Sequence, residues 1–281
     1  YTQTHYQLFY NHKFSSFFKA NIALFLTRGR GYYEQYKSAE SLGNYQLPDY
    51  NDGTNIITET DLVRRLWLDN YFYGTVFSLQ YQQKNTTIIA GGGLNKYDGK
   101  HFGEINWAMI QAAVPLNHRW YNLTAGKQDI SGYIKWTQKI NTNWQTFIDL
   151  QLRAADYSIN GFRNNPGLQV KNNYLFLNPK AGITFSKNKT QVYFSYAYAG
   201  KEPNRDDFES GVNTKPRAEM LHDFEAGIER KNKKTGWGIG LYYMLYRNQL
   251  VLTGKINDVG AYTRTNIPNS YRAGLELQGS H

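Results

Sequence analysis

A chain of 281 residues, 41% hydrophobic and 16% aromatic, is long enough to form one large β domain. It contains no cysteine, which excludes a disulfide framework and any thiolate metal site. The formal net charge is +10, but the basic residues are interleaved with acidic ones and gather in short turns, so we expect no nucleic-acid partner. No apolar run approaches the roughly 18 residues that a transmembrane helix needs.

Segments of alternating hydrophobicity follow one another along the chain, and we expect each to form a β-strand. They cover residues 3–13, 17–28, 65–83, 86–100, 126–140, 144–157, 173–186, 190–200, 220–231, 236–252 and 269–278. In the segment 144–157, Trp144 and Leu150 share an apolar face, whereas Asp149 and Arg153 share the opposite, polar face. This is the alternation of a wall that is apolar outside and polar inside.

The connections between these segments alternate between short and long. Short turns rich in Lys and Asn lie near residues 13–16, 83–85, 141–143, 187–189 and 231–234. Long polar excursions lie near residues 29–64, 97–125, 158–172 and 201–219. Barrels of bacterial outer membranes have short periplasmic turns and long extracellular loops. We therefore predict an all-β fold, an antiparallel transmembrane β-barrel segment surrounded by outer-membrane lipids.

Two further features of the segments favour a membrane wall over a soluble sandwich. Their length often exceeds ten residues, whereas strands of soluble proteins average about five or six. Trp and Tyr concentrate near the strand ends, as in interfacial girdles. The residues in question are Trp67, Tyr71, Trp136, Trp144, Tyr157, Tyr174 and Trp237.

The predicted strand count of about eleven is odd, whereas single-chain bacterial barrels close with an even number. An open sheet edge cannot lie in lipid, because its backbone groups would lack hydrogen-bond partners. The chain also begins at Tyr1 with neither Met nor a signal-peptide pattern, so we expect a mature protein or an excised piece. Together these observations predict part of a larger barrel.

Motifs in the second half of the chain resemble a known family. The sequence reads NPKAGITFSKNKTQVYFSYAYAG at 178–200, KEPNRDDF at 201–208, KPRAEMLHDFEAGIERK at 215–231 and SYRAGLEL at 270–277. In order and spacing these segments resemble the C-terminal half of the TonB-dependent outer-membrane receptors. The resemblance is strong from about residue 126 and weak before residue 65. It implies a single domain over 1–281, holding about eleven strands of a 22-stranded barrel without its plug domain.

The same resemblance implies a function and partners. It implies a receptor in the outer membrane of a Gram-negative bacterium that takes up a scarce nutrient, with a ferric siderophore or another iron complex preferred. The TonB–ExbB–ExbD complex would act on it through the missing plug. Haem, cobalamin and glycans stay open as substrates. A passive porin, an adhesion barrel and an outer-membrane enzyme are the rival functions.

Two groups of residues are candidates for binding. The excursion at 28–65 combines Tyr with Arg, which suits large, anionic, partly aromatic ligands such as ferric chelates. The ligand-binding candidates on these long loops are Arg30, Tyr32, Tyr33, Tyr36, Tyr45 and Arg205. Charged residues on the polar strand faces are expected to face the lumen, where they contact a plug or form a static, water-bathed lining. These are Asp149, Arg153, Asp223, Glu225, Glu229, Arg272 and Glu276.

Motifs for covalent chemistry are absent from the sequence. The six His residues show no spacing typical of metal ligands, and no Gly-x-Ser-x-Gly element is present. The adjacent His222 and Asp223 would point to opposite faces of a strand and so could not form a catalytic pair. We therefore expect no enzyme activity, no catalytic residue, no metal site and no cofactor.

Overall fold

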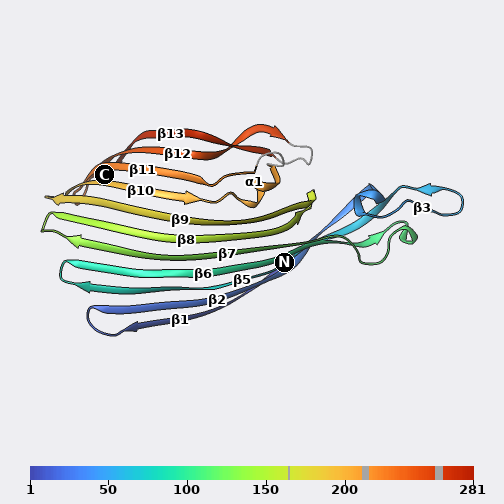
Figure 1. The fold of residues 1–281 in the computed structure, drawn as a ribbon, viewed down its shortest axis with the longest axis horizontal. Coiled ribbons are helices and arrows are strands. Elements are labelled where there is room, and N and C mark those ends of the chain that lie inside the picture. Colours follow the sequence, from blue (N-terminus) through green and yellow to red (C-terminus); the bar gives the residue numbers. More distant parts are fainter. Residues whose placement is uncertain (164, 211–214, 257–261) are drawn as a thin grey trace.

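A single antiparallel sheet of eleven strands forms the body of the protein in the computed structural model (Figure 1). The structure describes residues 1–163, 165–210, 215–256 and 262–281, so parts of the predicted excursions at 158–172 and 201–219 lie outside the described residues. Every strand of the sheet pairs with the next one in chain order. The strands are β1 (Thr2–Lys13), β2 (Phe18–Ser41), β5 (Glu59–Gln83), β6 (Thr86–Ala108), β7 (His118–Lys139), β8 (Trp144–Phe162), β9 (Asn165–Lys187), β10 (Thr190–Lys201), β11 (Glu219–Lys231), β12 (Gly236–Ile256) and β13 (Tyr262–Ser280). The predicted all-β fold and its strand number are confirmed, and β1 and β13 are the two edges of the open sheet.

Smaller elements join the strands at the end of the sheet that carries the long connections. These are the 3₁₀ helices η1 (Leu42–Tyr45) and η2 (Gln111–Ala113), the hairpin β3 (Tyr50–Asn51) and β4 (Ile56–Ile57), and the helix α1 (Arg205–Ser210). Within the described ranges, no helix has the length and apolar character needed to cross a membrane.

The short turns lie where the Lys/Asn clusters predict them. Asn188 and Lys189 join β9 to β10 with φ of 47° and 69°. Two consecutive positive φ values are typical of the type I′ turn, whose twist matches that of the strands it joins. Between β7 and β8, the Asn141 side chain accepts hydrogen bonds from the backbone N–H groups of Asn143 and Trp144 at 2.9 and 3.0 Å. These turns hold the hairpins in register at one end of the sheet.

The long excursions differ from the prediction, because much of their length is strand. The predicted loop at 29–64 is largely strand, since β2 continues to Ser41 and β5 begins at Glu59, with Tyr32 paired to Trp67 in register. Both faces of a hairpin that projects into water are solvated, so its sequence need not alternate between apolar and polar residues. The backbone hydrogen bonds between its two strands are nevertheless maintained. Arg30, Tyr32, Tyr33 and Tyr36 therefore lie on a strand instead of a loop.

Helix α1 identifies the concave face of the sheet. Asp207 forms an ion pair with Arg264 of β13 at 2.9 Å, while the adjacent Phe208 packs against Ile159 and Phe162 of β8. On a flat sheet, strands five steps apart would be separated by about 24 Å. Consecutive residues can contact both strands only where the sheet curls around them, so the face that carries α1 is concave.

The opposite, convex face is apolar over the central part of the strands. Leu175 of β9 and Leu277 of β13 are 69% and 71% exposed there. Their neighbours on this face include Ile148, Leu150, Leu152, Leu177, Ile239, Leu241, Tyr271 and Leu275. So large an exposed apolar surface marks contact with a membrane or another apolar phase. The predicted division between an apolar and a polar strand face is thus observed.

A compact hydrophobic core lies beyond the sheet, where two connections pack against each other. The core contains Leu42, Tyr45, Leu62, Leu66, Ile105, Ala108, Ala113, Val114 and Trp120. These residues come from the connection between β2 and β5, the connection between β6 and β7, and the adjoining strand ends. Figure 1 shows this lobe projecting beyond β9 to β13 on the side of β3. The lobe is therefore a folded unit that extends the wall.

Candidate functional site

The segment from Glu202 to Ser210 folds back onto the concave face, and an ion-pair network holds its start. Glu202, 6% exposed, accepts hydrogen bonds from Lys127 at 2.9 Å and from Arg153 at 2.7 Å. The same Arg153 donates to Asp129 on the neighbouring strand. Burial opposes ionisation of Glu202, but the hydrogen bonds from Arg153 and Lys127 outweigh it and lower the pKa of this carboxyl to about 2. Glu202 is thus a fixed anion at neutral pH.

A second contact holds the other end of this segment. Asp207, almost fully buried, pairs with Arg264, and its second oxygen accepts the backbone N–H of Asn204 at 2.6 Å. The segment therefore spans the concave face from β7 and β8 to β13. Arg153 lies on the polar face as predicted, but its charge is already matched by Asp129 and Glu202.

A cavity of about 260 Å³ opens on the concave face beside α1, and we call it the mouth cavity. Its lining includes Tyr33, Leu66, His101, Tyr121, Arg163 and Arg205. Two of the predicted ligand-binding residues, Tyr33 and Arg205, are thus brought together although 172 positions separate them in the sequence. The cavity combines two arginines and several aromatic groups with one carboxylate, that of Glu209.

Two other groups of the mouth cavity have perturbed acid–base properties. Burial lowers the pKa of His101, and the nearby Arg205 lowers it further. Burial also raises the pKa of the Tyr121 hydroxyl. Both side chains are therefore neutral near pH 7, so the positive charge of the cavity comes from arginine. Neutral imidazole and phenol groups can each donate and accept hydrogen bonds with a ligand.

Three other predicted ligand-binding residues lie on the opposite face of β2. The Arg30 guanidinium lies 5.5 Å from the centre of the Trp67 ring, and the Arg65 guanidinium lies 4.4 Å from that of Tyr32. Tyr36 donates a hydrogen bond to Asp61. Successive side chains of a strand point to opposite faces, so these three residues point away from Tyr33, and none of them lines the mouth cavity.

Tyr45, another predicted ligand-binding residue, is buried in the hydrophobic core of the lobe. Its side chain is 1% exposed in the core of the lobe, its hydroxyl donates to Glu40 at 3.0 Å, and it accepts from Arg64 at 2.9 Å. Burial raises the pKa of this hydroxyl to about 12. A ligand could reach Tyr45 only if the lobe opened.

The remaining wall charges occupy the concave face of β8 and of β11 to β13. Within the described ranges, no ion pair involves Asp149, Asp223, Glu225, Arg272 or Glu276, while Glu229 lies 3.9 Å from Lys231. One oxygen of Asp223 is buried without a hydrogen-bond partner. Among the predicted wall charges, Arg153 and Glu229 are thus ion-paired, and the other five have no ion pair with a described residue.

Glycines open the concave face beside three of these charges. A cavity of about 360 Å³ over Gly240 is bordered by Glu225, Arg272 and Glu276, with Tyr193 at its side. The sequence predicts this opening, because Gly236, Gly238 and Gly240 alternate along the polar face of β12. A group from outside the chain could enter here and meet two carboxylates and one guanidinium.

Sequence reasoning missed several residues of the concave face. His101 and Tyr121 lie in the excursion that the sequence predicts at 97–125, where no alternation marks a strand face. Lys127 and Asp129 alternate on the polar face of the predicted strand 126–140, a signal that could have identified them. The described residues contain no group of three or more His, Asp or Glu residues that could hold a metal ion.

Comparison with known proteins connects this architecture to a family. The sequence model of the family described as "TonB dependent receptor-like, beta-barrel" matches residues 1–281. The chain belongs to this family. The receptor resemblance carried by the motifs between 126 and 277 is thereby confirmed. No curated protein sequence matches the chain.

Solved structures of transporters share the receptor barrel fold. The "Copper transporter OprC" superposes with a TM-score of 0.76 at 10% identity, over 99% of this chain and 43% of the other. The "ferric citrate transporter FecA" gives 0.61 at 15% identity, over 99% and 38%. The "Ferric-Catecholate import receptor Fiu from K12 E. coli" gives 0.59 at 13%, over 99% and 44%. The chain thus spans less than half the length of each of these proteins.

Proposed function

We propose that this chain forms part of the wall of an outer-membrane receptor that takes up a metal chelate, preferably a ferric siderophore. The observation that carries the proposal is the mouth cavity, where Tyr33, Tyr121 and Arg205 meet on the concave face. Aromatic rings and guanidinium groups suit an anionic chelate with aromatic metal-binding arms. The family and the similar structures, which include ferric citrate and ferric-catecholate transporters, support the same substrate class.

The size of the mouth cavity limits what it can hold. Its volume of about 260 Å³ lies just below the range of roughly 300–1,000 Å³ that is usual for ligand pockets. We therefore expect it to hold one arm of the chelate, with the rest of the barrel and the plug completing the site.

Energy coupling is the second part of the proposal. The unpaired carboxylates Asp223, Glu225 and Glu276 would contact cationic groups of a plug domain, which the TonB–ExbB–ExbD complex would displace. Charge pairs that face water are individually weak, about 1 kcal/mol or less, so such contacts can be broken during each transport cycle. The chain itself would carry out no covalent chemistry.

Uptake of radiolabelled ⁵⁵Fe chelates by cells that make the full-length receptor tests the proposal. The double variant Tyr33→Ala and Arg205→Ala should raise the KM for uptake at least tenfold, because it removes a ring and a charge from the mouth cavity. Arg30→Ala is the matched control, since Arg30 lies on the opposite face, and it should leave KM unchanged.

The choice of substrate is tested in parallel. A deletion strain should lose growth on a ferric siderophore as the sole iron source and keep growth on cobalamin-dependent or glycan media. Loss of growth on glycan or cobalamin alone would refute the iron-chelate proposal. Uptake that is equal in the mouth-cavity variant and in the Arg30 control would refute the proposed binding site.

A further inference from the structure

The short turns form one continuous edge, at the end of the sheet opposite the lobe (Figure 1). Backbone hydrogen bonds tie a turn to the hairpin beside it. The N–H of Lys139 donates to the carbonyl of Asn85 at 2.8 Å, and the N–H of Lys231 donates to that of Lys189 at 3.1 Å. Neighbouring turns lie two strands apart, about 10 Å along this edge. The turns therefore keep a fixed spacing.

Lysine is the predominant charged residue of this edge. The turn residues 14–17, 84–85, 140–143, 188–189 and 232–235 contain no Asp or Glu. Within the described ranges, the lysines of the edge form one ion pair, that of Lys231 with Glu229 at 3.9 Å. The edge thus has an excess of positive charge. We call its exposed lysines the lysine rim, which consists of Lys13, Lys84, Lys139, Lys187, Lys189, Lys231, Lys233 and Lys234.

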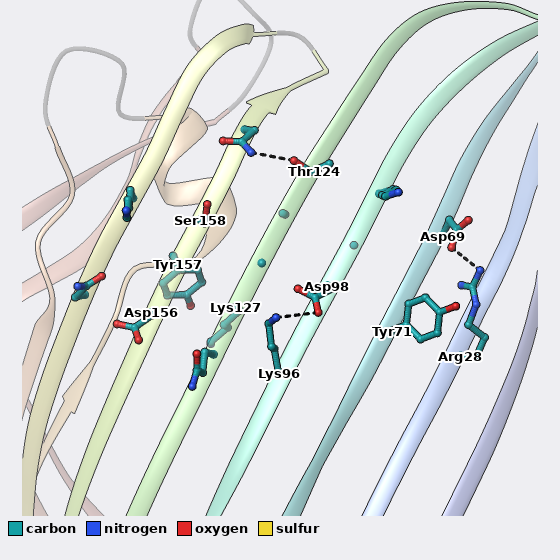
Figure 2. A pocket seen from close by; sticks show the side chains of 18 residues that line it. Arg28, Asp69, Tyr71, Lys96, Asp98, Thr124, Lys127, Asp156, Tyr157 and Ser158 are labelled. Carbon is teal, nitrogen blue, oxygen red and sulfur yellow. Dashed lines mark hydrogen bonds and ion pairs between the residues drawn. The ribbon is translucent and has the colours of Figure 1, made fainter.

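Charges are arranged differently nearer the long connections. Figure 2 shows a cavity of about 810 Å³ there, in which Arg28 pairs with Asp69 at 2.6 Å and Lys96 pairs with Asp98 at 3.3 Å. Carboxylates interleaved with the basic residues match part of the positive charge in that cavity. The turns supply no such carboxylates, so the lysine rim keeps its charge for an anionic group from outside the chain.

Part of the lysine rim lies on the concave face of the sheet. Lys139 pairs with Gln145 of β8, and Lys231 follows Glu229 by two residues on β11. Both lysines therefore share the face of Asp149 and Glu229, which is the side of α1. A membrane would contact the opposite, apolar face. Lysines that point away from that face favour a partner in the aqueous space over a lipid headgroup.

A cavity of about 400 Å³ lies within the lysine rim, at the turn between β9 and β10. Its lining includes Lys187, Lys189 and Lys231, together with Gln191 and Glu229. Three ammonium groups beside a single carboxylate favour an anionic guest, and the Gln191 amide can both donate and accept hydrogen bonds. An ammonium group is a point charge on a flexible stem, so it can pair with a carboxylate without demanding one orientation.

We propose that the lysine rim binds the acidic peptides of the cell-wall glycan that lies beneath the outer membrane. Free carboxylates repeat along this polymer as the lysines repeat along the turns, so several weak contacts can form together. One carboxylate would enter the cavity beside Lys187, Lys189 and Lys231, and others would pair with the neighbouring turns. The inference rests on the periplasmic position of short turns in outer-membrane barrels and not on the uptake of any ligand.

Cosedimentation of the full-length receptor in detergent with insoluble cell-wall sacculi tests this proposal. Sacculi whose carboxylates have been converted into amides are the matched probe, because they keep the glycan and lose the charge. The receptor should bind native sacculi and should bind amidated sacculi at least tenfold more weakly. Raising NaCl from about 0.05 M to about 0.5 M should release it, since salt screens exposed charges. No binding to native sacculi, or equal binding to both probes, would overturn the proposal.

A variant of the cavity lysines locates the binding at the rim. Replacing Lys187, Lys189 and Lys231 with Gln should weaken binding to native sacculi about tenfold, because each exposed charge pair contributes about a factor of two. Replacing the same three lysines with Arg should retain the binding.

The matched control removes the same charge from the other part of the wall. It replaces Lys100, Lys171 and Lys255, exposed lysines of β6, β9 and β12, with Gln and should leave the binding unchanged. Equal binding by the cavity variant and this control would overturn the assignment to the lysine rim.

Anionic phospholipid is the competing occupant of the rim. Phosphatidylglycerol added to the detergent micelles should leave the binding to sacculi unchanged. Displacement of the sacculi by this lipid would assign the lysines to headgroups and overturn the proposal. Because ⁵⁵Fe uptake is measured separately, failure of the cell-wall contact and failure of the proposed transport function are distinguishable.

Discussion

The concave face of the sheet has two halves that differ in how their charges are matched. On β7 and β8, Arg153 is held between Asp129 and Glu202, and Glu202 also binds Lys127. On β11 to β13, Asp223, Glu225 and Glu276 face the same space without an ion pair among the described residues. In the first half, the segment that carries α1 provides Glu202 as a partner for Lys127 and Arg153. In the second half, the charges are left for a group from outside the chain.

The largest expected effect comes from a comparison of two arginines of the concave face. Arg153→Met should destabilise the fold by about 3 kcal/mol, because it leaves Glu202 buried with a single cationic partner. Arg272→Met should cost less than about 1 kcal/mol, since Arg272 forms no ion pair with any described residue. Guanidinium unfolding of both variants in detergent, followed by tryptophan fluorescence, measures the two effects. Equal losses of stability would show that the two halves are not electrostatically distinct.

Lowering the pH should first release the segment that Glu202 holds on β7 and β8. The pKa of Glu202 is depressed from 4.5 to about 2, so its carboxylate stabilises the fold above pH 4.5. This stabilisation, at most roughly 3 kcal/mol, is lost as the pH falls from 4.5 to 2. Pepsin digestion across that window should show increasing cleavage within residues 202–218.

Glu202→Gln is the control for the acid prediction. Its side chain has no charge to lose, so cleavage within the same segment should already be fast at pH 4.5 and should increase little toward pH 2. A wild-type protein whose segment resists pepsin equally at pH 4.5 and pH 2 would contradict the role assigned to Glu202.

The smallest expected effect on stability concerns the half of the concave face on β11 to β13. The double variant Asp223→Asn and Glu225→Gln should change the free energy of unfolding by no more than about 0.5 kcal/mol, because neither carboxylate forms an ion pair within the described part of the chain. In the full-length receptor the same variant should slow chelate uptake while leaving the KM unchanged, since it alters plug contacts and leaves the mouth cavity intact. A large loss of stability would instead assign these carboxylates a structural role in the wall.

The sequence was most informative where one strand face is apolar. Alternation in segments such as 144–157 predicts both the strand and the side on which Asp149 and Arg153 lie. Beyond the apolar band both faces are wet, so nothing in the pattern distinguishes the strand that carries Tyr32 and Tyr33 from a loop. The hairpins there continue because backbone hydrogen bonds join their paired strands.

The partners within the candidate site could not be read from the sequence. Glu202 and Arg153 are 49 positions apart and meet because the chain after β10 folds back across two strands. Tyr45 looks like a loop tyrosine available to a ligand, yet the packing of η1 against η2 buries it. Such contacts depend on how the connections fold over the sheet, which period-two patterns do not encode.

The segment from Glu202 to Asp207 also has a consequence for how the wall is built. It ties β8 to β13 through Arg153 and Arg264, across a span that hydrogen bonds between adjacent strands do not cover. These two ion pairs therefore hold the curvature of the sheet without closure of a barrel. We expect a sheet of this kind to be curved before any further strand pairs with its edges, so that its radius is already defined.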